Sequence, residues 1–226
     1  MGLDCIRRLA FFANFSPSEL EQIFSLTRTL SLVAGQPLIL EGEPADRLYL
    51  VKSGTVRLSR TSPDGRSFTL DIVGVESIIG TEALFQADTY HSTAHALEPI
   101  CVLEFRQAQL EQLLLDHPEL ALKVIKSLSR ALMESADAFS TAVLSDARGR
   151  LMHLLRRLGQ RHGIQTPAGL RISLPLTHQE LADMAGLARQ TVTVLLNQLR
   201  AEGLIAIDGH RHIVLTESFP SASSVA

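Results

Sequence analysis

The chain has 226 residues, of which 46% are apolar, 20% charged and 5% aromatic. This length and composition predict one or two domains with a sizeable core and give no sign of a largely disordered chain. No apolar run is long enough for a membrane span, and the N-terminus has no signal-peptide pattern, so we expect a cytoplasmic protein without membrane contacts. Two cysteines, Cys5 and Cys101, exclude a disulfide framework and all-cysteine zinc or iron–sulfur sites.

The net charge of −3 is unevenly placed along the chain. Residues 1–145 carry 12 Lys and Arg against 18 Asp and Glu, whereas residues 146–226 carry nine arginines, no lysine and six acidic residues. An acidic part joined to a basic one is typical of a protein that binds nucleic acid through its basic part.

Residues 29–105 predict an antiparallel β-roll of the cupin-like jelly-roll type. Glycines recur between short segments in which apolar and polar residues alternate, as expected for short strands. In the clearest case two such segments flank Asp64-Gly65, which favours a hairpin whose second strand has Phe68, Leu70 and Ile72 as its apolar face. Before the roll, residues 16–19 (Ser-Pro-Ser-Glu) predict the capping box of a short helix.

From Glu119 the pattern becomes helical, with a narrow seam at alternating intervals of three and four residues. The seam comprises Ile125, Leu128, Leu132, Ser135, Phe139 and Ala142. Leu122, Val124 and Met133 widen the apolar surface beyond it. We therefore expect one side of the helix to pack on the roll and the seam to pair with a second copy, giving a homodimer.

Gly149 interrupts this helical pattern and predicts a hinge within residues 146–150. A second amphipathic helix over residues 151–161 then ends at Gly163, and residues 170–174 form a short strand.

Residues 176–199 carry the pattern of a helix–turn–helix. Thr177 and Glu180 predict a capping box at the start of the first helix. Gly186 stands where the turn requires a left-handed backbone, and the small Ala182 lets the second helix cross closely. This combination predicts a DNA-binding unit whose second helix is the recognition helix.

The second helix is anchored through Val192 and Leu195 in this interpretation, which leaves its polar residues exposed. Two short apolar strands around Asp208-Gly209 then predict a wing. The expected DNA contacts are Thr177, His178, Gln179, Arg189, Gln190, Thr191, Thr193 and His210. Among these, the expected phosphate contacts, which would set the register of the protein on DNA, are Thr177, His178, Gln179, Thr191 and the wing tip.

The chain is thus predicted to have an α+β fold with four parts. These are a β-roll sensor domain (residues 1–117), a dimerisation helix (118–145), a winged helix–turn–helix (146–217) and a disordered tail (218–226).

This order of segments resembles the CRP/FNR family of bacterial transcription regulators. The resemblance is carried by residues 40–45 (LEGEPA), 50–56 (LVKSGTV) and 79–85 (IGTEALF), by Gly149-Arg150, and by the helix–turn–helix. It implies a homodimer that binds a palindromic operator on double-stranded DNA, and RNA polymerase as a further partner if the protein is an activator. The sequence has no nucleophile elbow or phosphate-binding loop, so we also expect that the protein is not an enzyme.

The recognition helix departs from the family pattern Ser-Arg-Glu-Thr. Here residues 188–191 read Ala-Arg-Gln-Thr, and Val194 takes the place of a later arginine. Arg189 retains the donor fork that suits guanine. Gln190 both donates and accepts, so a preference for cytosine should weaken or move toward adenine. Ala188 removes the expected hydroxyl cap.

The effector site also departs from the family pattern. Members that bind cyclic AMP have Gly-Glu-Leu followed by Arg-Ser-Ala, and the corresponding candidates here are Gly80, Glu82, His91, Ser92, Thr93 and, on the long helix, Ser135. Because His91 replaces the arginine that holds the cyclic phosphate, the resemblance argues against cyclic AMP and leaves the signal unidentified.

Three alternatives remain open at this point. The first is a haem-dependent regulator that responds to nitric oxide or carbon monoxide, with His91, His95, Cys101 or Cys5 as ligands. The second is a regulator that acts without an effector. The third is a cupin-type metal enzyme that uses His91 and His95 on one face of a strand. The sequence leaves the operator, the target genes and the sign of regulation open.

Overall fold

The computed structural model describes residues 9–13, 15–85, 88–174, 176–208 and 212–220. The chain forms two compact units, residues 1–132 and 133–226, and each is described by itself. The division falls inside the long helix α3 (Pro118–Leu144). Among the described helices, none combines the length and hydropathy needed to cross a membrane.

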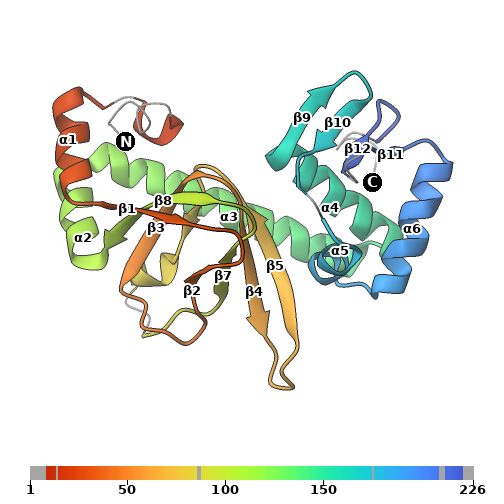
Figure 1. Ribbon diagram of the computed structural model, residues 1–226, viewed down its shortest axis with the longest axis horizontal. Helices are drawn as coiled ribbons and strands as arrows, with labels where there is room; N and C mark the ends of the chain where they lie inside the picture. The colour runs from red at the N-terminus through yellow and green to blue at the C-terminus, as the bar shows by residue number, and fades with distance from the viewer. Residues whose placement is uncertain (1–8, 14, 86–87, 175, 209–211, 221–226) are drawn as a thin grey trace. The chain divides into compact units, whose positions relative to one another are not determined.

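The first unit is a β-roll with helices at both ends (Figure 1). Its strands form two antiparallel sheets, ordered β1-β8-β3-β6 and β2-β7-β4-β5. The strands are β1 (Arg28–Leu32), β2 (Pro37–Ile39), β3 (Arg47–Ser53), β4 (Val56–Thr61), β5 (Ser67–Val73), β6 (Ile78–Ile79), β7 (Thr93–Ala96) and β8 (Ile100–Arg106). The helices are η2 (Ala10–Phe12), α1 (Pro17–Ser25), η3 (Thr81–Phe85), α2 (Gln107–Asp116) and the first part of α3. The predicted roll is confirmed.

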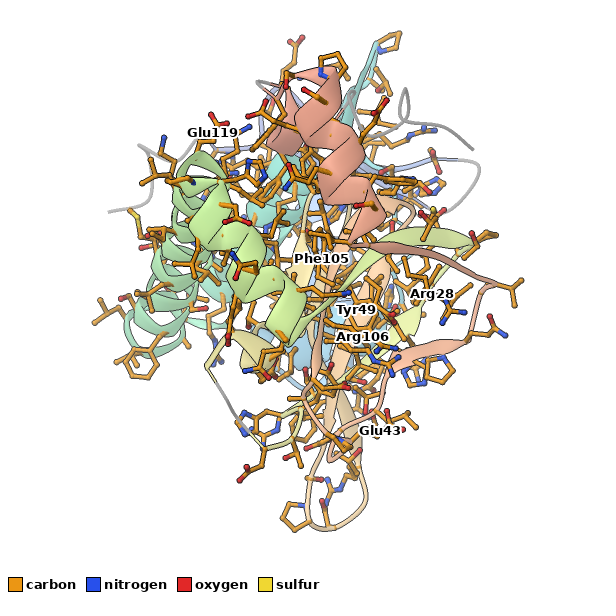
Figure 2. The ribbon with its side chains drawn as sticks, turned by 90° about the vertical axis from the view of Figure 1, so that its left-hand side faces the viewer. Arg28, Glu43, Tyr49, Phe105, Arg106 and Glu119 are labelled. Atoms are coloured by element: carbon orange, nitrogen blue, oxygen red, sulfur yellow. The ribbon has the colours of Figure 1, made fainter. Side chains whose placement is uncertain are left out.

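Apolar residues on the strands and helices of this unit form two buried clusters. One joins α1 and α2 to β3 and β8, and includes Leu20, Leu50, Leu103 and Leu113. The other lies between the two sheets and includes Val51, Val56, Ala94 and Val102. In Figure 2, Tyr49 and Phe105 lie in the interior of this unit, whereas Arg28 lies at its margin.

The start of α1 follows the predicted capping box. The Glu19 backbone N–H donates to Ser16 Oγ at 3.3 Å, and the Ser16 backbone N–H donates to Glu19 Oε2 at 2.8 Å. These bonds satisfy two backbone donors that a helix start otherwise leaves without partners.

The hairpin β4–β5 is present, but its apolar face is not the predicted one. Ser59 pairs with Thr69 and Leu58 with Asp71, so the register shifts and Leu70 has no counterpart. Because a one-residue shift turns the following side chains to the opposite face, Thr69 is buried while Phe68 and Leu70 are exposed. Only Ile72 of the three predicted residues is buried.

The long helix α3 buries one side and exposes another. Leu120 and Val124 are buried, as expected for the side that packs on the roll. The seam residues Ile125, Leu132 and Phe139 are exposed, and Leu128 is half-buried. Leu122 and Met133, which widen the apolar surface of the helix beyond the seam, are exposed as well.

The second unit combines the C-terminal part of α3 with three helices and a small sheet (Figure 1). The sheet is antiparallel with the order β11-β12-β10-β9. The elements are α4 (Ala147–His162), β9 (Gly163–Thr166), β10 (Gly169–Ile172), α5 (His178–Ala185), α6 (Arg189–Ala201), β11 (Ile205–Ile207) and β12 (Ile213–Leu215). The strand β9 has no counterpart in the sequence prediction.

The predicted hinge residue Gly149 does not interrupt a helix. It lies in the first turn of α4, where its N–H donates to Asp146 Oδ1 at 2.7 Å. The break between α3 and α4 lies at Ser145 and Asp146, because Asp146 adopts an extended backbone and caps α4.

Part of the predicted disordered tail is held against α4. The Arg156 guanidinium donates to the Pro220 carbonyl at 3.0 and 3.3 Å and lies 6.0 Å from the Phe219 ring centroid. Residues 221–226 lie outside the described residues. The local composition predicted disorder, because composition cannot reveal a contact with a helix that lies more than 60 residues earlier in the chain.

Candidate nucleic-acid interface

Helices α5 and α6 form the predicted helix–turn–helix and contact each other. Thr177 caps α5: its Oγ1 accepts from the Glu180 N–H at 3.2 Å, and its own N–H donates to Glu180 Oε2 at 2.8 Å. Gly186 ends α5 with φ 62° and ψ 43°, the left-handed conformation that the turn requires. The side chain of Ala182 is fully buried, as expected for a close crossing.

The side of α6 that packs on the rest of the unit is shifted from the predicted one. Val192, Leu196 and Leu199 are buried, whereas the predicted anchor Leu195 is only half-buried. The spacings of four and then three residues from Val192 to Leu196 and Leu199 average close to the helical repeat of about 3.6 residues. The single spacing of three residues from Val192 to Leu195 departs further from it. The prediction identified the face through Val192 but missed Leu196 and Leu199.

The start of α6 presents polar side chains to solvent. Arg189 and Gln190 are exposed, and Thr191 is half-buried. Ala188 occupies the cap position without a side-chain hydrogen bond. The first backbone N–H groups of α6 are therefore not capped by a side chain, and such groups are suited to an anion such as a DNA phosphate.

The structure brings two predicted contact residues from different helices together. His178 Nδ1 lies 2.8 Å from Thr193 Oγ1, and Thr193 Oγ1 also donates to the Arg189 carbonyl at 3.0 Å. On α5, Gln179 donates to Asp183 Oδ1 at 2.7 Å. Thr177, His178 and Gln179 are exposed at the start of α5. His210, at the predicted wing tip, lies outside the described residues.

A bidentate ion pair that the sequence did not reveal joins the start of α4 to the end of α6. Arg148 donates to both carboxylate oxygens of Glu202, at 2.8 and 2.5 Å. The hydrogen bonds from Arg148 lower the pKa of Glu202. No local pattern signals this pair, because its members lie 54 residues apart.

The effector candidates of the first unit lie around η3 and the start of β7. The His91 backbone N–H donates to Glu82 Oε1 at 3.2 Å, and Thr93 Oγ1 accepts from the Glu41 N–H at 3.0 Å. His91 is exposed, and Ser92 is half-buried. Ser135, the sixth candidate, is an exposed residue of α3 in the second unit.

Gly80 is buried against Tyr90 and the backbone of β3. A Cβ at Gly80 would lie 2.7 Å from the Arg47 carbonyl oxygen, so no larger residue fits. The Tyr90 hydroxyl donates to this same oxygen at 2.6 Å and accepts from the Arg47 N–H at 3.1 Å. Burial raises the pKa of Tyr90 above its ordinary value.

The candidate haem ligands lie on different elements of the first unit. His91 lies in a loop, His95 on β7, and Cys101 in the middle of the other sheet on β8, where it is buried. Cys5 lies outside the described residues. Burial and the neighbouring Arg57 lower the pKa of His95, and its Nδ1 is buried without a hydrogen-bond partner in the described part of the chain.

The cupin-like arrangement also differs from the prediction. Only His95 lies on a strand, because β7 begins at Thr93, so His91 and His95 do not share a strand face. The described residues contain no group of three or more His, Cys, Asp or Glu side chains that could hold a metal ion.

Comparisons with known proteins match both units. The cyclic nucleotide-binding domain family matches residues 29–117, and the Crp-like helix-turn-helix domain family matches residues 149–217. The chain is 31% identical to the global nitrogen regulator of Synechocystis over 80% of this chain and 84% of that protein. The chain belongs to the CRP/FNR family of transcription regulators.

Two further relatives of the CRP/FNR family span nearly the whole chain. The CRP-like cAMP-activated global transcriptional regulator of Mycobacterium tuberculosis is 27% identical over 95% of this chain and 96% of its own length. The structure of CooA from Carboxydothermus hydrogenoformans matches with a TM-score of 0.75 and 25% identity, covering 92% and 90% of the two chains.

These matches decide between the broad function classes. The relatives are transcription regulators of the CRP/FNR family, so this chain is a transcription regulator with a DNA-binding helix–turn–helix rather than an enzyme. The cupin-enzyme alternative is wrong.

The turn of this helix–turn–helix gives a stability prediction. A Cβ at Gly186 would meet only Arg150 Nη1, at 3.9 Å, so Gly186→Ala should cost only backbone strain, about 1 kcal/mol. Gly169, with φ 123°, serves as the comparison because its Cβ would lie 2.2 Å from the Leu215 carbonyl oxygen. Gly169→Ala should therefore cost about 3 kcal/mol or more. Urea unfolding of both variants measures this difference, and equal losses would contradict it.

Proposed function

We propose that this regulator binds a palindromic operator as a homodimer and reads each half-site with α6. The observation that supports this most strongly is the division of α6 into two faces. Val192, Leu196 and Leu199 anchor the helix, while Arg189 and Gln190 at its start are exposed and free of packing. A recognition helix places such N-terminal residues at the base edges of the major groove.

The dimer is supported by the seam on α3. Leu132 and Phe139 are each 72% exposed, and Ile125 is 56% exposed. An exposed apolar stripe of this length is typical of an interaction surface, and two copies of α3 would cover each other's stripe. A symmetric dimer would place two recognition helices about 34 Å apart, one helical turn of DNA.

The roll is proposed to respond to a signal other than cyclic AMP, or to act without one. The names of the relatives indicate several kinds of regulation, including activation by cAMP in the M. tuberculosis protein. In this chain, His91 occupies the position at which the family members that bind cyclic AMP carry an arginine. An imidazole lacks the permanent charge and the forked donor geometry of a guanidinium group.

Operator affinity is expected to be independent of cyclic AMP. Fluorescence anisotropy with the purified full chain, with and without the nucleotide, measures this directly. The M. tuberculosis relative serves as the positive control. Tighter operator binding upon addition of cyclic AMP would contradict the proposal.

The haem alternative has a separate test. An absorption spectrum after incubation with haem would show a Soret band that shifts with carbon monoxide if a specific site exists. Absence of such a band would exclude the haem alternative.

We also propose a cytoplasmic location, because the partner is DNA.

A further inference from the structure

A hollow of about 270 Å³ lies within the second unit, between the C-terminal part of α3, α4 and α5. Apolar side chains form much of its wall, including Ala138, Ala142, Leu154 and Met184. The hollow is close in size to the smaller ligand pockets of proteins. None of the DNA contacts predicted from the sequence lines this hollow.

Two of the polar side chains that line this hollow are guanidinium cations. Arg150 and Arg157 line it from α4, together with the imidazole of His153, and Thr141 lines it from α3. The Nε atom of Arg150 is buried and has no hydrogen-bond partner among the described residues. A buried guanidinium nitrogen without a partner is costly, and an anion in the hollow would supply the missing acceptor.

Acidic side chains around the hollow offset these charges only in part. Asp183 lines it from α5 and accepts a hydrogen bond from Gln179 at 2.7 Å. On α3, Glu134 forms an ion pair with Arg161. Burial, and then Arg157 and Arg156, lower the pKa of His153, while Asp137 raises it. The wall thus contains two guanidinium groups, those of Arg150 and Arg157, and one carboxylate, that of Asp183.

We infer that this hollow binds a small anionic metabolite that carries a carboxylate or phosphate group next to a short apolar body. Arg150 and Arg157 provide guanidinium donors for the anion, since their forked geometry suits both groups. His153 and Thr141 provide further hydrogen-bonding groups, and the alanine and methionine side chains contact the apolar part.

The location of the hollow gives the ligand a regulatory role. Its walls come from α3, from α4 and from α5, the first helix of the helix–turn–helix. A ligand that contacts all three stabilises one arrangement of them and so changes DNA affinity. This regulatory step rests on the DNA-binding role of α6, whereas ligand binding itself does not.

Isothermal titration calorimetry with the full chain tests the binding step without DNA. The probes are sodium succinate and sodium phosphate at constant ionic strength, with neutral succinamide as the uncharged control. We expect saturable binding of at least one anion, and the two probes distinguish carboxylate from phosphate. Arg150→Gln should weaken that binding by about tenfold or more, because it removes a charged donor.

Two further variants separate a ligand site from general effects of charge or folding. Ala138→Leu fills the hollow without changing its charge and should also weaken anion binding about tenfold. Arg28→Gln removes an exposed arginine at the margin of the first unit (Figure 2) and should leave anion binding unchanged. Unfolding temperatures of the free variants show whether each one folds.

Two results would overturn the inference. One is the absence of saturable binding by either anion. In that case, a loss of operator affinity in Arg150→Gln would show that Arg150 contacts a DNA phosphate instead. The other is equal anion affinity in the wild type, Arg150→Gln and Ala138→Leu.

Discussion

Replacing Leu132 and Phe139 by aspartate is expected to produce monomers that no longer bind the operator tightly. Both side chains are 72% exposed on α3 and belong to the predicted dimer seam. Carboxylates at both positions would place like charges across the helix pair and remove its apolar contact. Loss of the second half-site contact should weaken operator binding by about 100-fold or more. Light scattering during gel filtration reports the mass, and anisotropy reports the affinity.

The matched control for this variant is Leu115→Asp. Leu115 is 75% exposed, but it lies on α2 and not on the seam. The control should remain dimeric and should bind the operator as the wild type does. If the double variant keeps the mass of a dimer, the seam is not the dimer interface.

Arg189→Ala is expected to remove operator preference while non-specific DNA binding persists. Arg189 is exposed in the first turn of α6, where its guanidinium has the geometry to bind guanine O6 and N7. Such a contact contributes about 1–3 kcal/mol of discrimination, or about 5- to 150-fold in affinity. Competition of the operator against a scrambled duplex measures the ratio.

The control for Arg189 is Arg200→Ala, on the same helix but in its last turn. Removal of Arg200 should reduce binding to both duplexes equally or not at all, because the N-terminal residues of a recognition helix face the bases. A specificity ratio that is unchanged in Arg189→Ala would refute its assignment as a reader.

Gln190→Glu should move base preference toward cytosine. A carboxylate accepts only, which matches the cytosine N4 donor, whereas the amide of Gln190 also donates. Since the side chain is exposed at the start of α6, the change should leave the fold unaltered. Affinities for operators that differ at a single base pair in each half-site test this. If the ranking of bases does not change, Gln190 does not face a base.

Local sequence signals predicted the elements of this protein well where a single residue type determines the geometry. Ser16 and Thr177 cap their helices as predicted, and Gly186 adopts the left-handed conformation. These features depend on neighbours within a few residues, so the sequence contains the required information.

The features that sequence reasoning missed depend on contacts between distant segments. The register shift in β5 turned Phe68 and Leu70 outward, although alternation alone placed them inside. Phe219 lies against Arg156, although its segment has the composition of a tail. Period-two patterns cannot show a bulge, and composition cannot show which distant side chain meets a segment.

The candidate sites were predictable to different degrees. The DNA-facing residues follow from the helix–turn–helix pattern, because the turn fixes which end of α6 is exposed. The cationic hollow does not, since Arg150 and Arg157 meet α3 and α5 only after folding. In the sequence, these two arginines look like ordinary solvent-exposed charges of a basic segment.

Selection from a randomised pool of DNA duplexes, carried out in parallel with the wild type and Arg189→Ala, tests the central claim most directly. We expect the wild type to enrich a palindrome whose half-sites lie one helical turn apart and share a guanine. Arg189→Ala should lose enrichment of that guanine. A wild-type pool without a palindrome, or the same guanine in both pools, would contradict the assignment of α6 as the reader of a dimeric regulator.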